Sequence, residues 1–214
     1  MRRITKILLS LLMIAVVVEF AHAGVTMHWA QAEDLGGNTP TGYFSWDLMA
    51  TTTTNLAMQE LIVSTGVLGD IYQNTGSGSA LYTEPNPANF GSVPALEFDT
   101  YVTFSAWPYP TPTMVFGGAT DIIPGSVLTF NTQNLNVSWI PMFGNNTGPG
   151  TFQVARVTLK DTADGTWQFR GWQTGGIDAA LFGGSIVDGV PLPEPATLSL
   201  LLLGSLTLLR RRSS

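Results

Sequence analysis

The sequence predicts an all-β fold, an antiparallel β-sandwich or jelly roll, between two terminal segments of a different kind. Apolar and polar residues alternate along several short stretches, and clusters of Gly, Pro, Asn and Asp separate these stretches. Alternation with one polar face is typical of half-buried antiparallel strands. No stretch of ten residues has an amphipathic helical period, although the shorter Asn55–Leu61 also fits a helix. We expect about eight to ten strands.

The expected strands follow one another through the middle of the chain. Two of the clusters between them, Trp107–Pro112 and Gly144–Gly150, are long enough to form extended loops. A turn at Asp161–Gly165 is expected to join two strands as a hairpin. Trp139 and Trp167 fall on the apolar side of their strands, so we place both in the core. In chain order, the expected strands are Tyr43–Ala50, Leu61–Thr65, Ala80–Thr83, Phe98–Phe104, Ser126–Phe130, Leu135–Trp139, Thr151–Leu159, Thr166–Gln173 and Gly183–Val187.

Size and composition limit the classes of protein to which the chain can belong. Of its 214 residues, about 170 lie between the terminal segments, enough for one domain with a core. Charged residues make up 11% and hydrophobic residues 44%, which excludes a disordered chain rich in charge. Cysteine is absent, so disulfide scaffolds and thiol nucleophiles are excluded. Residues 24–193 hold three basic and thirteen acidic residues, a net charge of −10, which excludes nucleic acid as a partner.

The N-terminal segment has the features of a secretory signal peptide. Residues 1–23 begin with three basic residues and continue in the apolar run Ile7–Val18. This run is too short to span a membrane permanently. The small residues Ala21 and Ala23 stand at the third-last and last positions before Gly24, where a signal peptidase cleaves. We therefore expect a helical signal peptide that ends at Ala23 and a mature chain that begins at Gly24.

The C-terminal segment combines prolines, an apolar run and an arginine cluster. The run Ala196–Leu209 has no polar face, and as a helix it would be about 21 Å long, against roughly 30 Å for the hydrocarbon core of a bilayer. Arginines directly after it would snorkel to the cytoplasmic headgroups, and local thinning of the bilayer would cover the difference. We expect a helical tail that anchors the precursor with the domain facing outward. The flanking residues are Pro193, Glu194 and Pro195 before the run and Arg210, Arg211 and Arg212 after it.

These three parts, in this order at a C-terminus, resemble the PEP-CTERM sorting signal. The stretch Val190–Leu201 is close to VPEPATLSLL of that family, although Leu192 stands where the family has valine before Pro-Glu-Pro. The resemblance implies that a membrane-embedded exosortase recognises the signal and cuts the chain near it. Proteins of this family are exported by Gram-negative bacteria that make exopolysaccharide, and they are associated with the biofilm matrix. The stretches Phe98–Thr103, Phe152–Leu159 and Gly165–Trp167 also resemble other secreted members, which implies no activity.

The chain therefore divides into three expected parts: a signal peptide at 1–23, a single β-sandwich domain at 24–190, and the sorting signal with its hydrophobic helix and arginine cluster at 191–214. We expect an inner-membrane-anchored precursor that faces the periplasm and then moves to the cell surface or extracellular matrix. The expected partners are the secretion machinery, signal peptidase, exosortase, the membrane before processing, and matrix polysaccharide.

Candidate catalytic residues are few. His28 is the only histidine after residue 23 and lies near the expected mature N-terminus, in a segment expected to fray, and no Gly-x-Ser-x-Gly motif is present. Glu97 and Asp99 are two apart on an expected strand, so both would share one face while Phe98 points to the core. They form a solvated polar face, a carboxylate pair, or a calcium site if loop oxygens join them. We expect no catalytic activity, no cofactor and no resident metal.

Aromatic side chains outside the expected core are candidates for sugar binding, because indole and phenol rings stack on pyranose faces. Trp107 and Tyr109 lie in a proline-rich loop, and Trp172 lies on the polar phase of its strand. Alternatively, these rings close the end of the sandwich. The main expectation is an exported, exosortase-sorted protein of the surface or matrix without catalysis. The alternative is a lectin-like carbohydrate-binding module, assisted by calcium at its acidic loops.

Overall fold

The computed structural model describes residues 20–22, 24–34, 36–74, 84–103, 114–116, 128–140, 148–173 and 179–193. Within them most residues are in strands, so the prediction of an all-β fold is confirmed. The expected C-terminal helix lies outside the described residues, and of the expected helical signal peptide only Phe20–His22 is described, as the strand β1. The strands are β1 (Phe20–His22), β2 (Val25–Gln31), β3 (Tyr43–Thr52), β4 (Leu56–Thr65), β5 (Tyr101–Val102), β6 (Met114–Phe116), β7 (Thr129–Phe130), β8 (Asn134–Ile140), β9 (Gly150–Lys160), β10 (Gly165–Gln173), β11 (Ala179–Val187) and β12 (Val190–Pro193). Two short 3-10 helices are η1 (Pro87–Asn89) and η2 (Pro94–Phe98).

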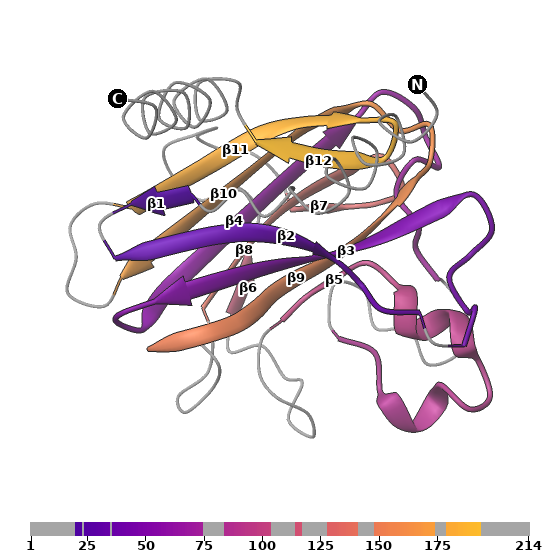
Figure 1. Ribbon diagram of the computed structural model, residues 1–214, viewed down its shortest axis with the longest axis horizontal. Helices are drawn as coiled ribbons and strands as arrows, with labels where there is room; N and C mark the ends of the chain where they lie inside the picture. The colour runs from indigo at the N-terminus through magenta and orange to yellow at the C-terminus, as the bar shows by residue number, and fades with distance from the viewer. Residues whose placement is uncertain are drawn as a thin grey trace, which may run out of the picture.

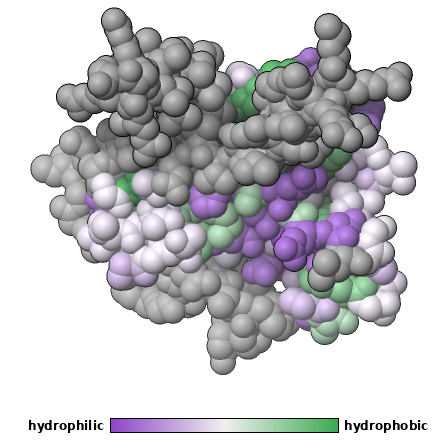
Figure 2. All heavy atoms as spheres, in the orientation of Figure 1, coloured by the Kyte–Doolittle hydropathy of each residue, from purple (hydrophilic) through white to green (hydrophobic). Residues whose placement is uncertain are grey.

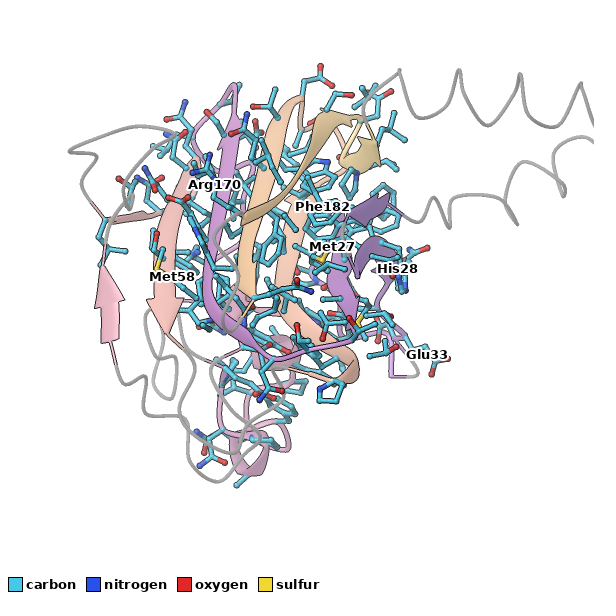
Figure 3. All side chains as sticks on the ribbon, turned by 90° about the vertical axis from the view of Figure 1, so that its left-hand side faces the viewer. Met27, His28, Glu33, Met58, Arg170 and Phe182 are labelled. Carbon is cyan, nitrogen blue, oxygen red and sulfur yellow. The ribbon has the colours of Figure 1, made fainter. Side chains whose placement is uncertain are left out.

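The strands form two antiparallel sheets that pack face to face (Figure 1). Sheet A has the order β1-β2-β3-β9-β5, and sheet B has the order β12-β11-β10-β4-β8-β6, with β7 also paired to β8. The side view shows Met27 of β2 and Phe182 of β11 in the space between the sheets (Figure 3). The architecture is therefore a two-layer β-structure of the sandwich kind.

The core lies between the sheets because alternate residues of each strand point inward. In β2, Met27 and Trp29 are buried, and in β10, Trp167 and Phe169 are buried. Trp29 and Trp167 meet edge to face from opposite sheets, with ring centroids 5.4 Å apart, a favoured geometry for aromatic pairs. Trp139 and Trp167 are no more than 1% exposed, so the prediction that both belong to the core is confirmed.

Strand β4 shows that the helical alternative for Asn55–Leu61 is wrong. Residues Leu56–Thr65 form a strand in the middle of sheet B, paired to β10 on one side and to β8 on the other. Leu61 lies opposite both Phe169 and Val137 and is fully buried. Pairing on both sides satisfies the backbone groups of this segment, and this tertiary context outweighs a weak local preference.

The expected strand Phe98–Phe104 is also wrong in its first half. Pro94 opens the 3-10 helix η2, which runs to Phe98, and its fixed φ suits the start of a helical turn. Leu96 and Phe98 are both buried by this turn. The strand is limited to Tyr101–Val102, which pairs with β9, and Phe104 lies outside the described residues.

The turn Asp161–Gly165 is not a hairpin. It leads from β9 in sheet A to β10 in sheet B, and these strands do not pair with each other. Ala163 is fully buried at the crossing, and its backbone N–H donates to the Lys160 carbonyl at 2.9 Å. Ala163 lies where the chain crosses from sheet A to sheet B, whereas a hairpin turn would lie at the surface.

The remaining expected strands agree with the structure to different extents. Strand β2 lies between β1 and β3, so the expectation that the segment around His28 frays is wrong. Ser126–Phe130 is seen only as β7, and Ala80–Thr83 lies outside the described residues. Strand β12 crosses the expected domain boundary after residue 190. Within the described ranges, no helix is long and apolar enough to cross a membrane.

Candidate functional site

The predicted sorting motif begins at the last residue of strand β12. Pro193 ends the strand, where it lies opposite Gly184 of β11. The other predicted motif residues lie outside the described residues: Glu194, Pro195, Arg210, Arg211 and Arg212. The ordered sheet therefore continues up to the first proline of Pro-Glu-Pro.

A tight hairpin sets the position of β12. Asp188 and Gly189 have φ values of 49° and 71°, and they join Val187 to Val190, which lie opposite each other. Two central residues with positive φ are the mark of a type I′ turn, for which Asp-Gly is a preferred pair. The Gly189 N–H donates to the Ala163 carbonyl at 2.8 Å, and Trp46 Nε1 of sheet A donates to the Gly189 carbonyl at 2.8 Å. The turn is thus tied to both sheets.

The other end of β12 packs against Trp167. The indole Nε1 of Trp167 donates to the Leu192 carbonyl at 3.1 Å. A methyl group added at Gly184 would overlap that same carbonyl oxygen, so the close approach of β12 to β11 requires glycine at this position. The Leu192 carbonyl, directly before Pro193, therefore contacts both Trp167 of β10 and Gly184 of β11.

The prolines of β12 suit an edge strand. Val187 and Val190 face each other across a two-residue turn, so the backbone groups of Val190 and Leu192 point toward β11. Pro191 and Pro193 occupy the alternate positions, where a backbone N–H would point away from the sheet. Proline at these positions costs no sheet hydrogen bond and blocks pairing with a further strand.

The predicted signal-cleavage site lies in the turn between β1 and β2. Ala21 is in β1 opposite Thr26, Gly24 has a φ of 86°, and Ala23 lies outside the described residues. The Gly24 carbonyl accepts a hydrogen bond from the Thr53 N–H at 3.1 Å. In the folded chain, the residues on both sides of the predicted cut are therefore engaged in sheet A.

Both predicted processing sites lie on the same side of the molecule. Strand β1 is the edge of sheet A, β12 is the edge of sheet B, and β1 contacts β11 across the gap between the sheets. Figure 1 shows β11 above β2, with β1 near the left end of β11 and β12 beside its right-hand part. The described chain thus begins and ends along one side of the two-layer structure.

The aromatic candidates for sugar binding receive little support. Trp107 and Tyr109 lie outside the described residues. Trp172 is half-buried on the outer side of β10, opposite Met58 of β4, and the Arg170 guanidinium lies over its ring, 5.5 Å from the centroid. Figure 3 shows Arg170 and Met58 on the side of sheet B that faces away from the core. One face of the Trp172 ring is therefore already occupied by a side chain.

The residues considered for catalysis do not form a carboxylate pair on a strand. Glu97 is in η2, and Asp99 follows the helix as a buried residue whose Oδ1 accepts hydrogen bonds from the N–H groups of Asn74 at 2.8 Å and Thr100 at 2.9 Å. The hydrogen bonds to Asp99 hold the turn after η2 in place. Among the residues that the structure describes, no group of three or more His, Cys, Asp or Glu side chains could hold a metal ion.

The described residues also contain a polar cluster that the sequence analysis above does not predict. We call it the Arg156 cluster, and it comprises Asp47, Glu84, Tyr101, Gln153 and Arg156 on the outer face of sheet A. Arg156 Nε donates to Asp47 Oδ1 at 2.7 Å, and its Nη2 donates to Asp47 Oδ2 at 2.9 Å, which makes a bidentate pair. Gln153 Nε2 donates to Asp47 at 2.9 Å and to the Tyr101 hydroxyl at 3.3 Å. Figure 2 shows hydrophilic residues across the middle of this face.

The cluster fastens the segment 84–103 onto sheet A. Arg156 Nη1 donates to the Glu97 carbonyl at 2.6 Å, and the guanidinium carbon lies 5.8 Å from the ring centroids of Phe98 and Tyr101. Burial raises the pKa of Tyr101 to about 12 and also raises the pKa of Glu84. Burial opposes the charge on Arg156, but the hydrogen bonds to Asp47 prevail and raise the pKa of the guanidinium. These contacts are those of a structural clamp.

No protein-family model matches the chain, and no curated protein matches it.

Proposed function

We propose that the protein is an exported protein that is processed at both ends and sorted through its Pro-Glu-Pro signal to the cell surface or extracellular matrix, without a catalytic role. The observation that carries the proposal is the C-terminal succession of Pro193-Glu194-Pro195, an apolar run and three arginines, together with a signal peptide at the other end of the chain. Exosortase and signal peptidase are the partners that this proposal requires.

The geometry of the domain is compatible with that topology. After removal of the signal peptide, the tail would be the membrane attachment, and it follows β12, an edge strand of sheet B. The last described strand, β12, reaches Pro193, the first residue of Pro-Glu-Pro, so the described domain extends to the start of the proposed signal. Because signal peptidase takes an extended substrate, its cut would precede the pairing of β1 with β2.

A net charge of −10 over residues 24–193 suits a soluble domain outside the cell. We do not extend the proposal to carbohydrate binding. Trp172 is partly covered by Arg170, and the two other candidate rings lie outside the described residues.

The test is the intact mass of the native protein recovered separately from membranes and from culture matrix. We expect the wild-type matrix form to lack residues 1–23 and the apolar tail. Glu194→Ala is expected to keep the tail and remain in the membrane, whereas Glu33→Ala, which removes an exposed carboxylate of the domain, should behave as wild type. Retention of the tail in wild-type protein from the matrix would refute the sorting proposal.

A further inference from the structure

Strand β12 is only four residues long, yet contacts hold it at both ends. The Asp188-Gly189 turn fixes its start through hydrogen bonds to Ala163 and from Trp46. Its end is fixed by the hydrogen bond from Trp167 to the Leu192 carbonyl, at a place where β11 has Gly184. Trp167 is itself 1% exposed and packs edge to face on Trp29 of the opposite sheet. The end of β12 is therefore attached to the centre of the core.

We infer that β12 determines where the sorting protease can cut, and that Trp167 and Gly184 are positioning residues for this cut. This inference depends on the proposed function, because it concerns the same processing step. It states that the released protein keeps β12 and ends at Pro193 or beyond, and that no cut occurs within Val190–Pro193 while Leu192 is held.

The physical reason lies in how a protease binds its substrate. A protease needs an extended backbone whose N–H and C=O groups are free to pair with the enzyme, as an added strand pairs with a sheet edge. In β12, the backbone groups of Val190 and Leu192 face β11, and the Leu192 carbonyl accepts a hydrogen bond from Trp167. The first peptide bond beyond these contacts joins Pro193 to Glu194.

The prolines restrict the choice further. Pro191 and Pro193 have no N–H on the outward side of β12, so an enzyme cannot pair with that side of the strand as with an ordinary edge. The cut breaks one amide bond after β12. The carbonyl carbon of that bond becomes bonded to the oxygen of water or to the nitrogen of an acceptor amine. The tail leaves with the new amino group at its N-terminus. The domain supplies no group to this step and only limits which bond is available.

Gly184→Ala tests the inference directly. The added methyl group would overlap the Leu192 carbonyl oxygen, so the end of β12 would have to leave β11. Trp167→Phe removes the indole N–H and keeps an aromatic ring, so we expect a smaller effect in the same direction. Gly91→Ala is the matched glycine control, because a methyl group there meets no atom within 4 Å. Trp139→Phe is the matched tryptophan control, as Trp139 is equally buried but lies in β8.

The measurement is the C-terminal residue of the full-length protein after processing in its native host, read by intact mass. We expect wild type and both controls to give one C-terminus at Pro193 or later. Gly184→Ala is expected to give additional C-termini between Val190 and Pro193. A wild-type product that lacks part of β12, or a Gly184→Ala product identical to wild type, would overturn the inference.

A second measurement separates this inference from the proposed function. If the tail is never removed in the host, the sorting proposal fails, but the protection of β12 can still be tested by limited digestion of the detergent-solubilised full chain with proteinase K. Protection predicts a wild-type fragment that ends at Pro193 or later and a shorter fragment for Gly184→Ala. Equal fragments from the two proteins, or wild-type cuts inside β12, would refute it.

Discussion

The Arg156 cluster provides the sharpest test of what holds the domain together. Asp47 and Arg156 are only 17% and 14% exposed, and Asp47 accepts three hydrogen bonds from Arg156 and Gln153. Asp47→Ala would leave the Arg156 guanidinium buried without its counter-charge. Removing one partner of a buried pair typically costs about 3–5 kcal/mol. We expect about 3 kcal/mol, since Arg156 keeps its bond to the Glu97 carbonyl.

The free energy of unfolding can be measured by urea denaturation followed by tryptophan fluorescence. For a domain of this size, a loss of about 3 kcal/mol corresponds to a fall in Tm of about 6–12 °C. The double variant Asp47→Leu with Arg156→Met removes both charges, so we expect it to be more stable than Asp47→Ala alone. Glu33→Ala should change stability by less than about 0.5 kcal/mol, because Glu33 is exposed. If Asp47→Ala lowers the free energy of unfolding by less than about 1 kcal/mol, the Asp47–Arg156 pair does not stabilise the domain as inferred.

Three further outcomes follow from the structure. Burial raises the pKa of Tyr101 from 10.0 to about 12, so the folded state keeps the hydroxyl proton to a higher pH than the unfolded state does. The free energy of unfolding should therefore fall between about pH 10 and 12, by roughly 3 kcal/mol in total, and urea titrations should show that Tyr101→Phe removes this fall. Burial also raises the pKa of Glu84, so the stabilisation of the folded state by protonated Glu84 is lost as the pH rises above 4.5, the ordinary pKa of the group. Glu84→Gln should therefore flatten the dependence of Tm on pH above 4.5, and an unchanged slope would disprove this. Trp167→Phe should lower the free energy of unfolding by about 1–3 kcal/mol, because it removes the hydrogen bond to Leu192 and shrinks a buried ring. It should also increase amide hydrogen exchange at Val190 and Leu192, and unchanged exchange would show that Trp167 does not hold β12.

The end of β12 illustrates how a motif and a strand can overlap. The proline-rich stretch 190–195 indicates an exposed recognition segment, which favours a domain boundary after residue 190. The local signal for a hairpin was nevertheless present, since Asp188-Gly189 stands between Val187 and Val190. Prolines that argue against a central strand are compatible with an edge strand. Only the pairing with β11 decides between these two interpretations.

The Arg156 cluster was not anticipated because its members are far apart in the chain. Asp47 and Arg156 are 109 positions apart, and Tyr101 lies between them in sequence. Single charged residues on the polar phase of a strand are usually solvated, so nothing local marks these as a pair. Neighbouring strands β3 and β9 place Asp47 directly opposite Arg156, and this register is a property of the assembled sheet.

Local residue patterns were enough to predict the strand-rich character of the domain and the placement of Trp139 and Trp167 in its core. These properties depend on residues close together in the chain: period-two alternation reports that one face of a strand is buried. Tertiary structure alone decided that β9 and β10 belong to different sheets, that Leu56–Thr65 is a strand, and that Pro193 ends one. Alternation shows which side of a strand is buried but does not identify its partner, and the partner is set by packing between distant segments.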